Sequence, residues 1–209
     1  MKVKKLIHNY EGLKKWYDEH YLENGTWPTS DRYANKIVNL LIPHLSKNIQ
    51  ECNLLDVACG SGFFLENVKQ KFLDVKGIDL SSVAIKEGRC RDPELNIAIG
   101  NGESINFHPN EFDIVVCLGS LEHYLNIDKG LSEMYRVLKY NGILVVLLPT
   151  DFIWLELDVQ PVETVSTIEE WKARIESIKF RILEIFDTTK DEELAKFSNK
   201  CHIFIAKKN

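Results

Sequence analysis

Residues 54–65 read Leu54-Leu55-Asp56-Val57-Ala58-Cys59-Gly60-Ser61-Gly62-Phe63-Phe64-Leu65. A short apolar strand leads here into a glycine turn, and the turn leads directly into a helix. Glycine allows backbone conformations that other residues avoid and lets a ligand approach closely, while the helix offers free N–H groups in its first turn. Ligands of open α/β sheets lie beyond the carboxyl ends of the strands. We therefore expect this turn to border a ligand site.

Apolar runs along the chain give seven candidate strands. They span residues 53–57, 74–80, 96–99, 112–118, 143–148, 180–186 and 201–206. The runs 112–118 and 143–148 are nearly continuous in Val, Ile and Leu, which is typical of central strands covered on both faces. Segments with helical periodicity alternate with the strands, and this predicts an α/β fold with a doubly wound, mostly parallel, seven-stranded sheet. Only about a dozen polar residues separate the last two runs, so we expect an antiparallel C-terminal hairpin at the edge.

The two flanks of this pattern show no strand periodicity. Residues 1–31 are rich in Tyr and Trp, and we interpret them as an N-terminal aromatic cap. Ser30 is the predicted N-cap of the helix that follows, and Pro43 should kink or end that helix. Residues 150–167 are a second irregular stretch, which we expect to be an insertion on the substrate side. The whole chain 1–209 is then a single domain.

The composition is that of an ordinary globular protein and argues against several functions. A net charge of −5 disfavours a nucleic-acid partner, because an acidic surface repels phosphates. No apolar run is long enough for a signal peptide or a membrane span, so we expect a cytoplasmic protein without a membrane partner. The five cysteines show no C-x-x-C spacing, and we expect reduced, buried side chains rather than disulfides or zinc ligands. We expect no metal site, since the acidic residues Asp151, Glu156 and Asp158 form no recognised ligand pattern.

Asp79 stands 19 positions after Gly60, at the end of the predicted strand 74–80. An acidic residue at about this distance also binds the ribose in dinucleotide enzymes. Two residues favour another nucleoside: Leu65 occupies the place of the third glycine of the dinucleotide fingerprint, and Asp56 would lie beside a bound pyrophosphate. A ligand with a ribose and a positive charge but no phosphate agrees with both carboxylates, and S-adenosylmethionine is such a ligand. A nicotinamide-dependent oxidoreductase stays as an alternative at this point.

These features in order resemble the class I S-adenosylmethionine-dependent methyltransferases, over roughly residues 35–149 and more loosely to the end of the chain. The resemblance implies a Rossmann-like methyltransferase fold. It also implies that S-adenosyl-L-methionine contacts Asp56, Ala58, Gly60, Gly62, Phe63, Asp79, Leu80, Asn101, Gly102, Glu103, Leu118 and Gly119. In the family the acid at the end of the second strand accepts hydrogen bonds from both ribose hydroxyls, and Asp79 matches it.

The chain departs from the family pattern at two positions. Ala58 stands where the glycine motif usually has its first glycine, and because the residue is still small we expect a minor change. Asn101 stands where the family usually has an Asp that accepts from the adenine amino group. Its amide oxygen still accepts a hydrogen bond, although without charge. Glu103, two residues later, is either a cofactor contact or only a surface residue.

Methyl transfer from a sulfonium is an in-line displacement, so the protein mainly has to hold donor and acceptor close and aligned. A hydroxyl or ammonium acceptor must also lose a proton, and His123, with Glu122 beside it, is the candidate base. The aromatic content of the flanks favours a small or partly apolar acceptor over a nucleic acid, and we expect the methyl group to go to an O or N atom of it. The candidate acceptor-binding residues are Tyr17, Tyr21, Trp27, Tyr124 and Trp154.

Two functions without methyl transfer also stay open. A catalytically silent partner subunit would bind the same cofactor, and departures such as Ala58 and Asn101 are what such a protein would show. A purely structural interaction protein is the weaker alternative, because it gives no reason for a glycine turn with two carboxylates.

Overall fold

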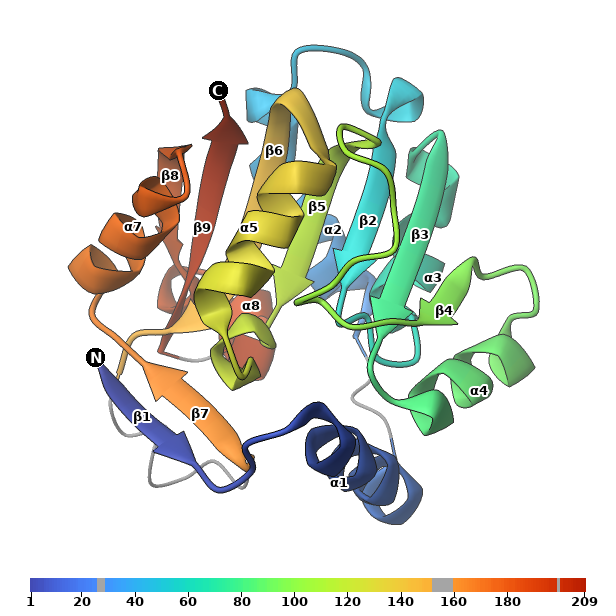
Figure 1. Cartoon of the computed structure of the whole chain (residues 1–209). Helices are drawn as coiled ribbons and strands as arrows, with labels where there is room; N and C mark the ends of the chain where they lie inside the picture. Colours follow the sequence, from blue (N-terminus) through green and yellow to red (C-terminus); the bar gives the residue numbers. More distant parts are fainter. Residues whose placement is uncertain (26–28, 152–159, 199) are drawn as a thin grey trace.

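The structure is a computed structural model that describes residues 1–25, 29–151, 160–198 and 200–209 (Figure 1). Its strands are β1 (Lys2–Lys5), β2 (Asn53–Val57), β3 (Asp74–Asp79), β4 (Ile97–Ile99), β5 (Phe112–Leu118), β6 (Leu138–Pro149), β7 (Val162–Val165), β8 (Phe180–Asp187) and β9 (Cys201–Lys208). Its α-helices are α1 (Tyr10–Asn24), α2 (Asp31–Leu41), α3 (Phe63–Val68), α4 (Ser82–Arg91), α5 (Ile127–Val137), α7 (Ile168–Ser177) and α8 (Glu192–Ser198).

The main sheet has seven strands in the order β4-β3-β2-β5-β6-β9-β8. The first five of these strands are mutually parallel, and β9 pairs antiparallel with both β6 and β8. The predicted fold class is therefore confirmed, including the antiparallel strands at the C-terminal end. β5 lies between β2 and β6 and is largely buried, as its continuous apolar sequence predicted.

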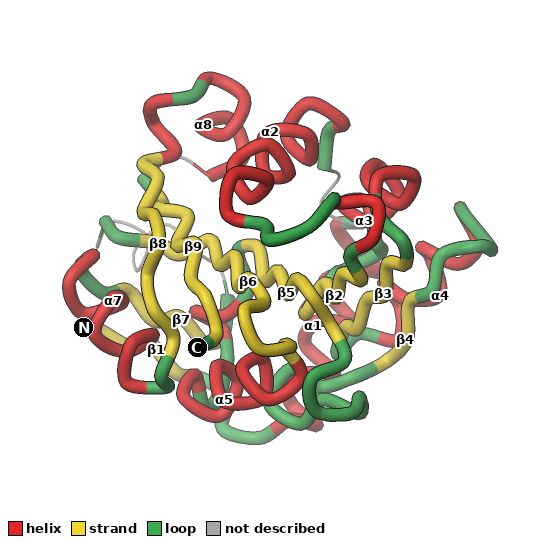
Figure 2. Tube along the Cα trace, turned by 90° about the horizontal axis from the view of Figure 1, so that it is seen from above, coloured by secondary structure: helices red, strands yellow, loops and turns green. Residues whose placement is uncertain are grey.

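Helices cover both faces of this sheet, as Figure 2 shows. On one face α2, α3 and α8 pack over a core that includes Ile37, Leu65 and Leu194. On the other face α5 and α7 pack over a core that includes Met134 and Trp171. Two hydrophobic cores separated by the sheet are the arrangement expected of a doubly wound fold.

The contact between α3 and β3 explains how the chain manages without the third glycine of the dinucleotide fingerprint. Leu65 of α3 lies over Gly77 of β3, and a Cβ at Gly77 would approach Leu65 Cδ1 to 2.7 Å. The glycine that permits the close approach is thus Gly77 of the strand rather than a residue of the helix. Close helix–sheet packing next to the glycine turn is preserved.

Several local predictions are confirmed and others need correction. Ser30 caps α2 by accepting a hydrogen bond of 3.1 Å from the N–H of Tyr33. The helix ends at Leu41 and is followed by a 3₁₀ turn that contains Pro43. The flanks were wrongly expected to contain no strands, because β1 and β7 pair antiparallel, with Lys4 opposite Glu163. These strands are only four residues long, too short for alternation to reveal them.

Three further expectations were wrong in detail. β6 begins at Leu138 rather than at residue 143, so the strand is longer at its start than the apolar run predicted. The polar connection between β8 and β9 contains helix α8 instead of being a plain loop. Cys90 is exposed, whereas Cys52, Cys117 and Cys201 are buried as expected. Within the described ranges, no helix is both long and apolar enough to cross a membrane.

Candidate cofactor and acceptor site

A cavity of about 650 Å³ lies at the carboxyl ends of β2, β3 and β5, with α1 on its outer side (Figure 1). The sequence-predicted residues that line it are Tyr17, Tyr21, Asp56, Ala58, Gly60, Phe63, Asp79, Leu80, Asn101, Gly102, Glu103, Leu118, Gly119, Glu122, His123 and Tyr124. Small-molecule sites typically have volumes of about 300–1,000 Å³. The fold thus brings the predicted motifs together around one space large enough for a small ligand.

The glycine turn after β2 is built from left-handed backbone. The φ angles are 64° at Ala58, 56° at Gly60 and 79° at Gly62. Ala58 therefore holds a conformation that costs a residue with a Cβ about 1–2 kcal/mol, and the substitution expected to be minor carries strain. Gly62 does not line the cavity, since a Cβ there would meet Leu95 Cδ1 at 3.2 Å. Its role is to begin α3 rather than to face the ligand space.

Asp79 fastens this turn to the neighbouring strand. Its Oδ2 accepts a hydrogen bond of 2.8 Å from the N–H of Gly60, and its Oδ1 accepts one of 2.8 Å from the N–H of Ser81. Burial raises the pKa of Asp79 to about 6, although these two backbone donors oppose the shift. Each carboxylate oxygen keeps a further lone pair. The position therefore suits a ligand with two adjacent hydroxyl groups that donate hydrogen bonds to the carboxylate.

Asp56 lines the cavity and is only 3% exposed. Burial, and after it the charge of Asp79, raises the pKa of Asp56 to about 8. Within the described ranges no side chain or backbone group donates a hydrogen bond to this carboxylate. A buried carboxylate without a partner is unfavourable unless it is protonated or meets a cation. The residues present thus fit a ligand with a ribose and a positively charged group.

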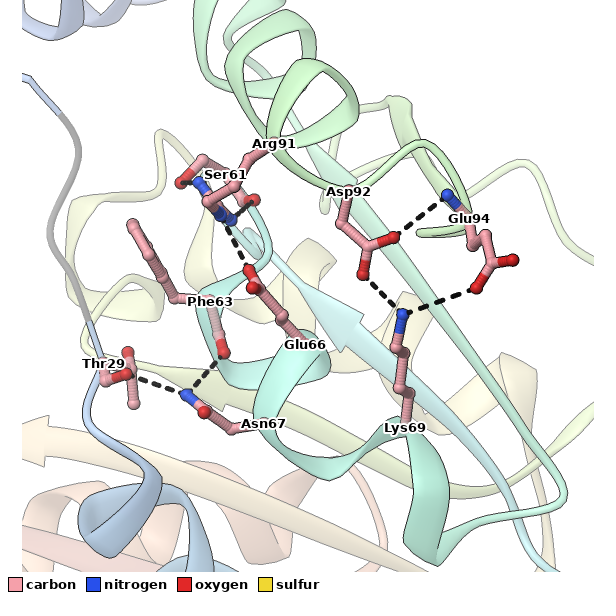
Figure 3. Close-up of polar contacts among 9 residues, drawn as sticks. All are labelled: Thr29, Ser61, Phe63, Glu66, Asn67, Lys69, Arg91, Asp92 and Glu94. Carbon is pink, nitrogen blue, oxygen red and sulfur yellow. Dashed lines mark hydrogen bonds and ion pairs between the residues drawn. The ribbon is translucent and has the colours of Figure 1, made fainter.

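Arg91 of α4 supports the glycine turn from its outer side (Figure 3). Its guanidinium donates hydrogen bonds to the carbonyl oxygen of Ser61 at 2.7 Å and to Ser61 Oγ at 3.3 Å. The same group stacks at 3.7 Å over the ring of Phe63 and pairs with Glu66 at 2.7 Å. A planar, multidentate side chain thereby joins the turn and the start of α3 into one unit.

Helix α1 is attached to the start of α4 by Asp18. Its Oδ1 accepts hydrogen bonds from Ser81 Oγ at 2.6 Å and from the N–H of Val83 at 3.2 Å, and its Oδ2 accepts one from Ser82 Oγ at 3.0 Å. Lys14 also donates to Asp18. Burial favours the neutral acid, but the hydrogen bonds outweigh it and lower the pKa of Asp18 to about 2. The helix that carries Tyr17 and Tyr21 is thus held beside the cavity.

The segment after β4 forms a tight turn. Asn101 Oδ1 accepts a hydrogen bond of 2.8 Å from the N–H of Glu103, so the oxygen expected to face adenine already has one donor. Glu103 is 2% exposed and accepts a hydrogen bond of 2.6 Å from Tyr10, which corrects its reading as a surface residue. Burial and the contact with Glu103 raise the pKa of Tyr10 to about 12. Gly102 leaves room for Tyr124, whose hydroxyl oxygen would lie 2.0 Å from an added Cβ.

His123 lies between two buried carboxylates at the other end of the cavity. Its Nδ1 is 2.8 Å from the carbonyl oxygen of Val162 and 2.9 Å from Glu163 Oε2, and its Nε2 is 3.9 Å from Glu122 Oε1. Because a carbonyl oxygen only accepts, Nδ1 carries a proton in this contact. The carboxylates of Glu122 and Glu163 are 8% and 1% exposed. Glu163 and its neighbour Gln160 belong to the segment expected only as an irregular insertion.

Other candidate residues do not contribute to the described cavity. Trp27 and Trp154 lie outside the described residues, as do Glu156 and Asp158 of the acidic trio. Asp151, the third member of that trio, pairs with Lys200 at 3.2 Å. Among the residues that the structure describes, no group of three His, Cys, Asp or Glu side chains has the arrangement of a metal site.

Comparisons with known proteins agree with the resemblance to methyltransferases. A family profile described as "Methyltransferase domain" matches residues 55–146. A demethylmenaquinone methyltransferase from Renibacterium salmoninarum is 37% identical over 93 residues, which is 44% of this chain and 39% of that protein. One from Bacteroides fragilis is 31% identical over 149 residues, which is 66% of this chain and 57% of that protein. A ubiquinone biosynthesis O-methyltransferase from Azoarcus is 32% identical over 97 residues, 43% of this chain and 40% of that protein.

Solved structures share the fold over nearly the whole length. The [4+2]-cyclase SpnF has a TM-score of 0.75 at 19% identity and covers 98% of both chains. An S-adenosylmethionine-dependent methyltransferase from Clostridium acetobutylicum has a TM-score of 0.72 at 15% identity, over 95% of this chain and 98% of the other. The geranyl diphosphate C-methyltransferase of Streptomyces coelicolor has a TM-score of 0.71 at 16% identity, over 96% of this chain and 97% of the other.

The curated relatives are matched over about 40–57% of their own length. The match of the family profile covers the glycine turn, Asp79, Asn101 and the strands β3 to β5, with parts of β2 and β6. These are the elements that surround the cavity on its sheet side. Residues 55–146 of this chain therefore match the methyltransferase domain family, in agreement with the resemblance to class I S-adenosylmethionine-dependent methyltransferases.

Proposed function

We propose that this chain transfers the methyl group of S-adenosylmethionine to an O or N atom of a small-molecule acceptor. The main support for the proposal is that one cavity is lined both by Asp79 with the glycine turn and by His123 with Glu122 and Glu163. Cofactor and acceptor would then share one space, which is what an in-line transfer needs. In this proposal residues 1–209 act as one domain, with 1–31 capping the cavity and 150–167 bordering the acceptor.

The sheet side of the cavity would hold the cofactor. Asp79 would accept hydrogen bonds from the two ribose hydroxyls, a charge-assisted and therefore strong contact. Asp56 would face the cationic part of the ligand, and the segment from Asn101 to Glu103 would face the adenine. Leu118 and Gly119, at the end of β5, would line the path toward the acceptor. When bound, the cofactor supplies an electrophilic methyl group that needs no further activation.

His123 would act as the general base for an acceptor that must lose a proton. With Nδ1 donating to the carbonyl of Val162, Nε2 of the neutral imidazole is left as the proton acceptor. Glu163 next to Nδ1 and Glu122 next to Nε2 would stabilise the imidazolium that forms after proton transfer. Proton removal by a positioned base typically contributes about 10²–10⁴-fold to a rate.

The relatives support methylation of a small molecule. Those named above act on quinone precursors by name, and their match covers less than two thirds of their length. A neighbour of the same fold is named a cyclase, so the fold by itself does not fix the reaction.

Calorimetry with S-adenosylhomocysteine and with NAD tests the ligand first. We expect binding of S-adenosylhomocysteine only. Transfer of a labelled methyl group from S-adenosylmethionine to a panel of small molecules then tests the reaction, and His123→Ala should lower kcat by about 10²-fold or more without weakening S-adenosylhomocysteine binding. Binding without transfer to any acceptor would instead indicate the silent partner subunit. Unchanged turnover in His123→Ala would remove His123 as the base.

A further inference from the structure

The turn after β4 presents one amide and one carboxylate side chain to the same part of the cavity. Asn101 and Glu103 both line this part of the cavity. Asn101 Oδ1 accepts a hydrogen bond of 2.8 Å from the N–H of Glu103, within the turn. Glu103 is 2% exposed, and its Oε2 accepts a hydrogen bond of 2.6 Å from the hydroxyl of Tyr10. The two side chains therefore differ in what they can still offer a ligand.

The hydrogen bond to Glu103 fixes which way the amide group of Asn101 is turned. With Oδ1 held by a backbone donor, the other terminal atom of the side chain is Nδ2, which donates and cannot accept. An aspartate at this position would keep a second oxygen for a ligand. Asn101 thus presents a donor where an incoming amino group needs an acceptor.

Tyr10 of α1 agrees with this orientation of the amide. Burial, and after it the hydrogen bond to Glu103, raises the pKa of Tyr10 to about 12, whereas a hydrogen bond with the Asn101 side chain opposes the rise. A hydrogen bond lowers the pKa of a phenol when it is donated to the phenol oxygen, because it then favours the phenolate. The amide of Asn101 therefore acts as a donor toward Tyr10, and the hydroxyl of Tyr10 donates to Glu103.

Glu103 supplies the acceptor that Asn101 lacks. Within the described residues, its Oε1 has no hydrogen-bond or ion-pair partner, while Oε2 is held by Tyr10. An ionised carboxyl group only accepts hydrogen bonds, and burial makes each missing donor unfavourable. A ligand with an amino group at this end of the cavity would provide the missing donor.

We propose that Glu103, and not Asn101, binds the 6-amino group of the adenine of S-adenosylmethionine, with Oε1 as the acceptor. This inference rests on the proposed function and concerns the nucleobase end of the same site. It differs from the family pattern, in which the residue at position 101 accepts from this amino group. Glu103 then determines which base is bound, and Tyr10 is the positioning residue that holds its carboxylate.

The proposed contact distinguishes adenine from hypoxanthine. Adenine carries an amino group at position 6, which donates, whereas hypoxanthine carries a carbonyl oxygen there, which only accepts. A carboxylate facing that oxygen would leave two acceptors opposed in a buried place, which is unfavourable. Sites that bind a donor group strongly reject analogues without it. The preference between the two bases therefore reports on the group that faces position 6.

Calorimetric titrations with S-adenosylhomocysteine and with its 6-oxo analogue, S-inosylhomocysteine, measure this preference, because the two ligands differ only in the base. We expect the unmodified protein to bind S-adenosylhomocysteine at least about thirtyfold more tightly than the analogue. Equal affinities would overturn the inference, whatever the variants show.

Two variants separate direct binding from support of α1. Glu103→Gln keeps the size of the side chain but can turn its NH₂ group toward the carbonyl oxygen of the analogue, so the ratio of the two Kd values should fall at least about tenfold. Tyr10→Phe removes the support and keeps the carboxylate, so both affinities should fall and their ratio should change by less than about threefold. An unchanged ratio in Glu103→Gln, or an equal fall of the ratio in Tyr10→Phe, would contradict the inference.

Glu94→Gln is the control for the loss of one carboxylate. Its side chain is 89% exposed and lies outside the described lining of the cavity. Both affinities should stay at their values in the unmodified protein. A ratio that falls in this variant as in Glu103→Gln would show an effect of net charge and contradict a contact by Glu103.

The residue that the family usually has at position 101 provides a test by rescue. Asn101→Asp, made in the Glu103→Gln protein, returns one carboxylate to the turn and leaves it an oxygen that can accept from the amino group. We expect the preference for S-adenosylhomocysteine to return to within about threefold of that of the unmodified protein. No recovery would place the amino group away from this turn and contradict the inference.

The failure of this inference and that of the proposed function are distinguishable in the same titrations. Absence of S-adenosylhomocysteine binding by the unmodified protein would refute the proposed function and, with it, the role of Glu103. Binding of S-adenosylhomocysteine with a base preference that Glu103→Gln leaves unchanged would refute the role of Glu103 alone.

Discussion

Arg91 and Ser61 are joined by two hydrogen bonds, at 2.7 Å to the carbonyl oxygen and at 3.3 Å to the hydroxyl of Ser61. Residue 61 lies in the turn that borders the cavity, whereas Arg91 lies at the end of α4 (Figure 3). The arginine therefore holds the cofactor side of the cavity without facing the ligand space. It is a positioning residue in our account.

Arg91→Lys should weaken S-adenosylhomocysteine binding by about tenfold, because an ammonium group cannot bridge Ser61 and Glu66 while stacking on Phe63. The Kd from calorimetry measures this effect. Lys69→Ala is the matched control. Lys69 follows α3 and pairs with Asp92 and Glu94, which follow α4, but it does not contact the glycine turn. An affinity that falls equally in both variants would show that any lost contact between α3 and α4 weakens binding, and that Arg91 does not specifically position the glycine turn.

Ala58→Gly should stabilise the protein, because the φ of 64° is strained for alanine and free for glycine. We expect the free energy of unfolding to rise by about 0.5–1 kcal/mol, after the greater chain entropy of glycine is subtracted. Ala84→Gly, the same substitution in helix α4, should lower it by about 1 kcal/mol. Urea unfolding of both variants provides the comparison, and a loss of stability at position 58 would argue against the left-handed turn.

Asp56 should release a proton when a cationic ligand binds. Its pKa of about 8 in the free protein means that the acid is mostly protonated near neutral pH, and a bound cation favours the carboxylate. Because the folded pKa is raised above the usual 3.8, ionisation of Asp56 destabilises the free protein as the pH rises from about 4 to about 8. Titration of S-adenosylmethionine in buffers of different ionisation enthalpy counts the proton. Asp56→Asn should abolish the release, and an unchanged count would assign it elsewhere.

Asp18→Ala should loosen α1 at the cavity. The variant loses the acceptors of Ser81, Ser82 and Val83, so we expect about 1–3 kcal/mol lower stability and faster release of S-adenosylhomocysteine. Since the pKa of Asp18 is lowered to about 2, this stabilisation is present above the ordinary value of 3.8 and lost as the pH falls toward 2. Glu19→Ala, at an exposed carboxylate on the same helix, should leave the release rate unchanged. Stopped-flow displacement measures both rates.

The parts of the structure that follow from local sequence were predictable. The continuous apolar runs of β5 and β6 placed both strands in the sheet centre, and the glycine turn with Asp79 placed the cavity at the strand ends. Both predictions rest on residues close together in the sequence, whose type and spacing indicate the same structure.

The acceptor end could not be predicted, because it is created by tertiary contacts. Glu163 reaches His123 only because β7 pairs with the four-residue strand β1, from the opposite end of the sequence. Arg91 faces the turn only because Gly88 lets α4 approach it: a Cβ at Gly88 would lie 2.3 Å from the Ser61 carbonyl oxygen. Neither the Glu163–His123 contact nor the Arg91–Ser61 contact corresponds to a sequence motif with a fixed spacing.

Calorimetric titration of Asp79→Asn with S-adenosylhomocysteine tests whether the carboxylate of Asp79 binds the ribose of the cofactor. Asparagine keeps the size of the side chain and one acceptor for the turn, but it loses the charge that strengthens two hydrogen bonds to a ribose. We predict binding at least about hundredfold weaker than in the unmodified protein, with the fold retained by circular dichroism. An affinity equal to that of the unmodified protein would show that the Asp79 carboxylate does not bind the ribose.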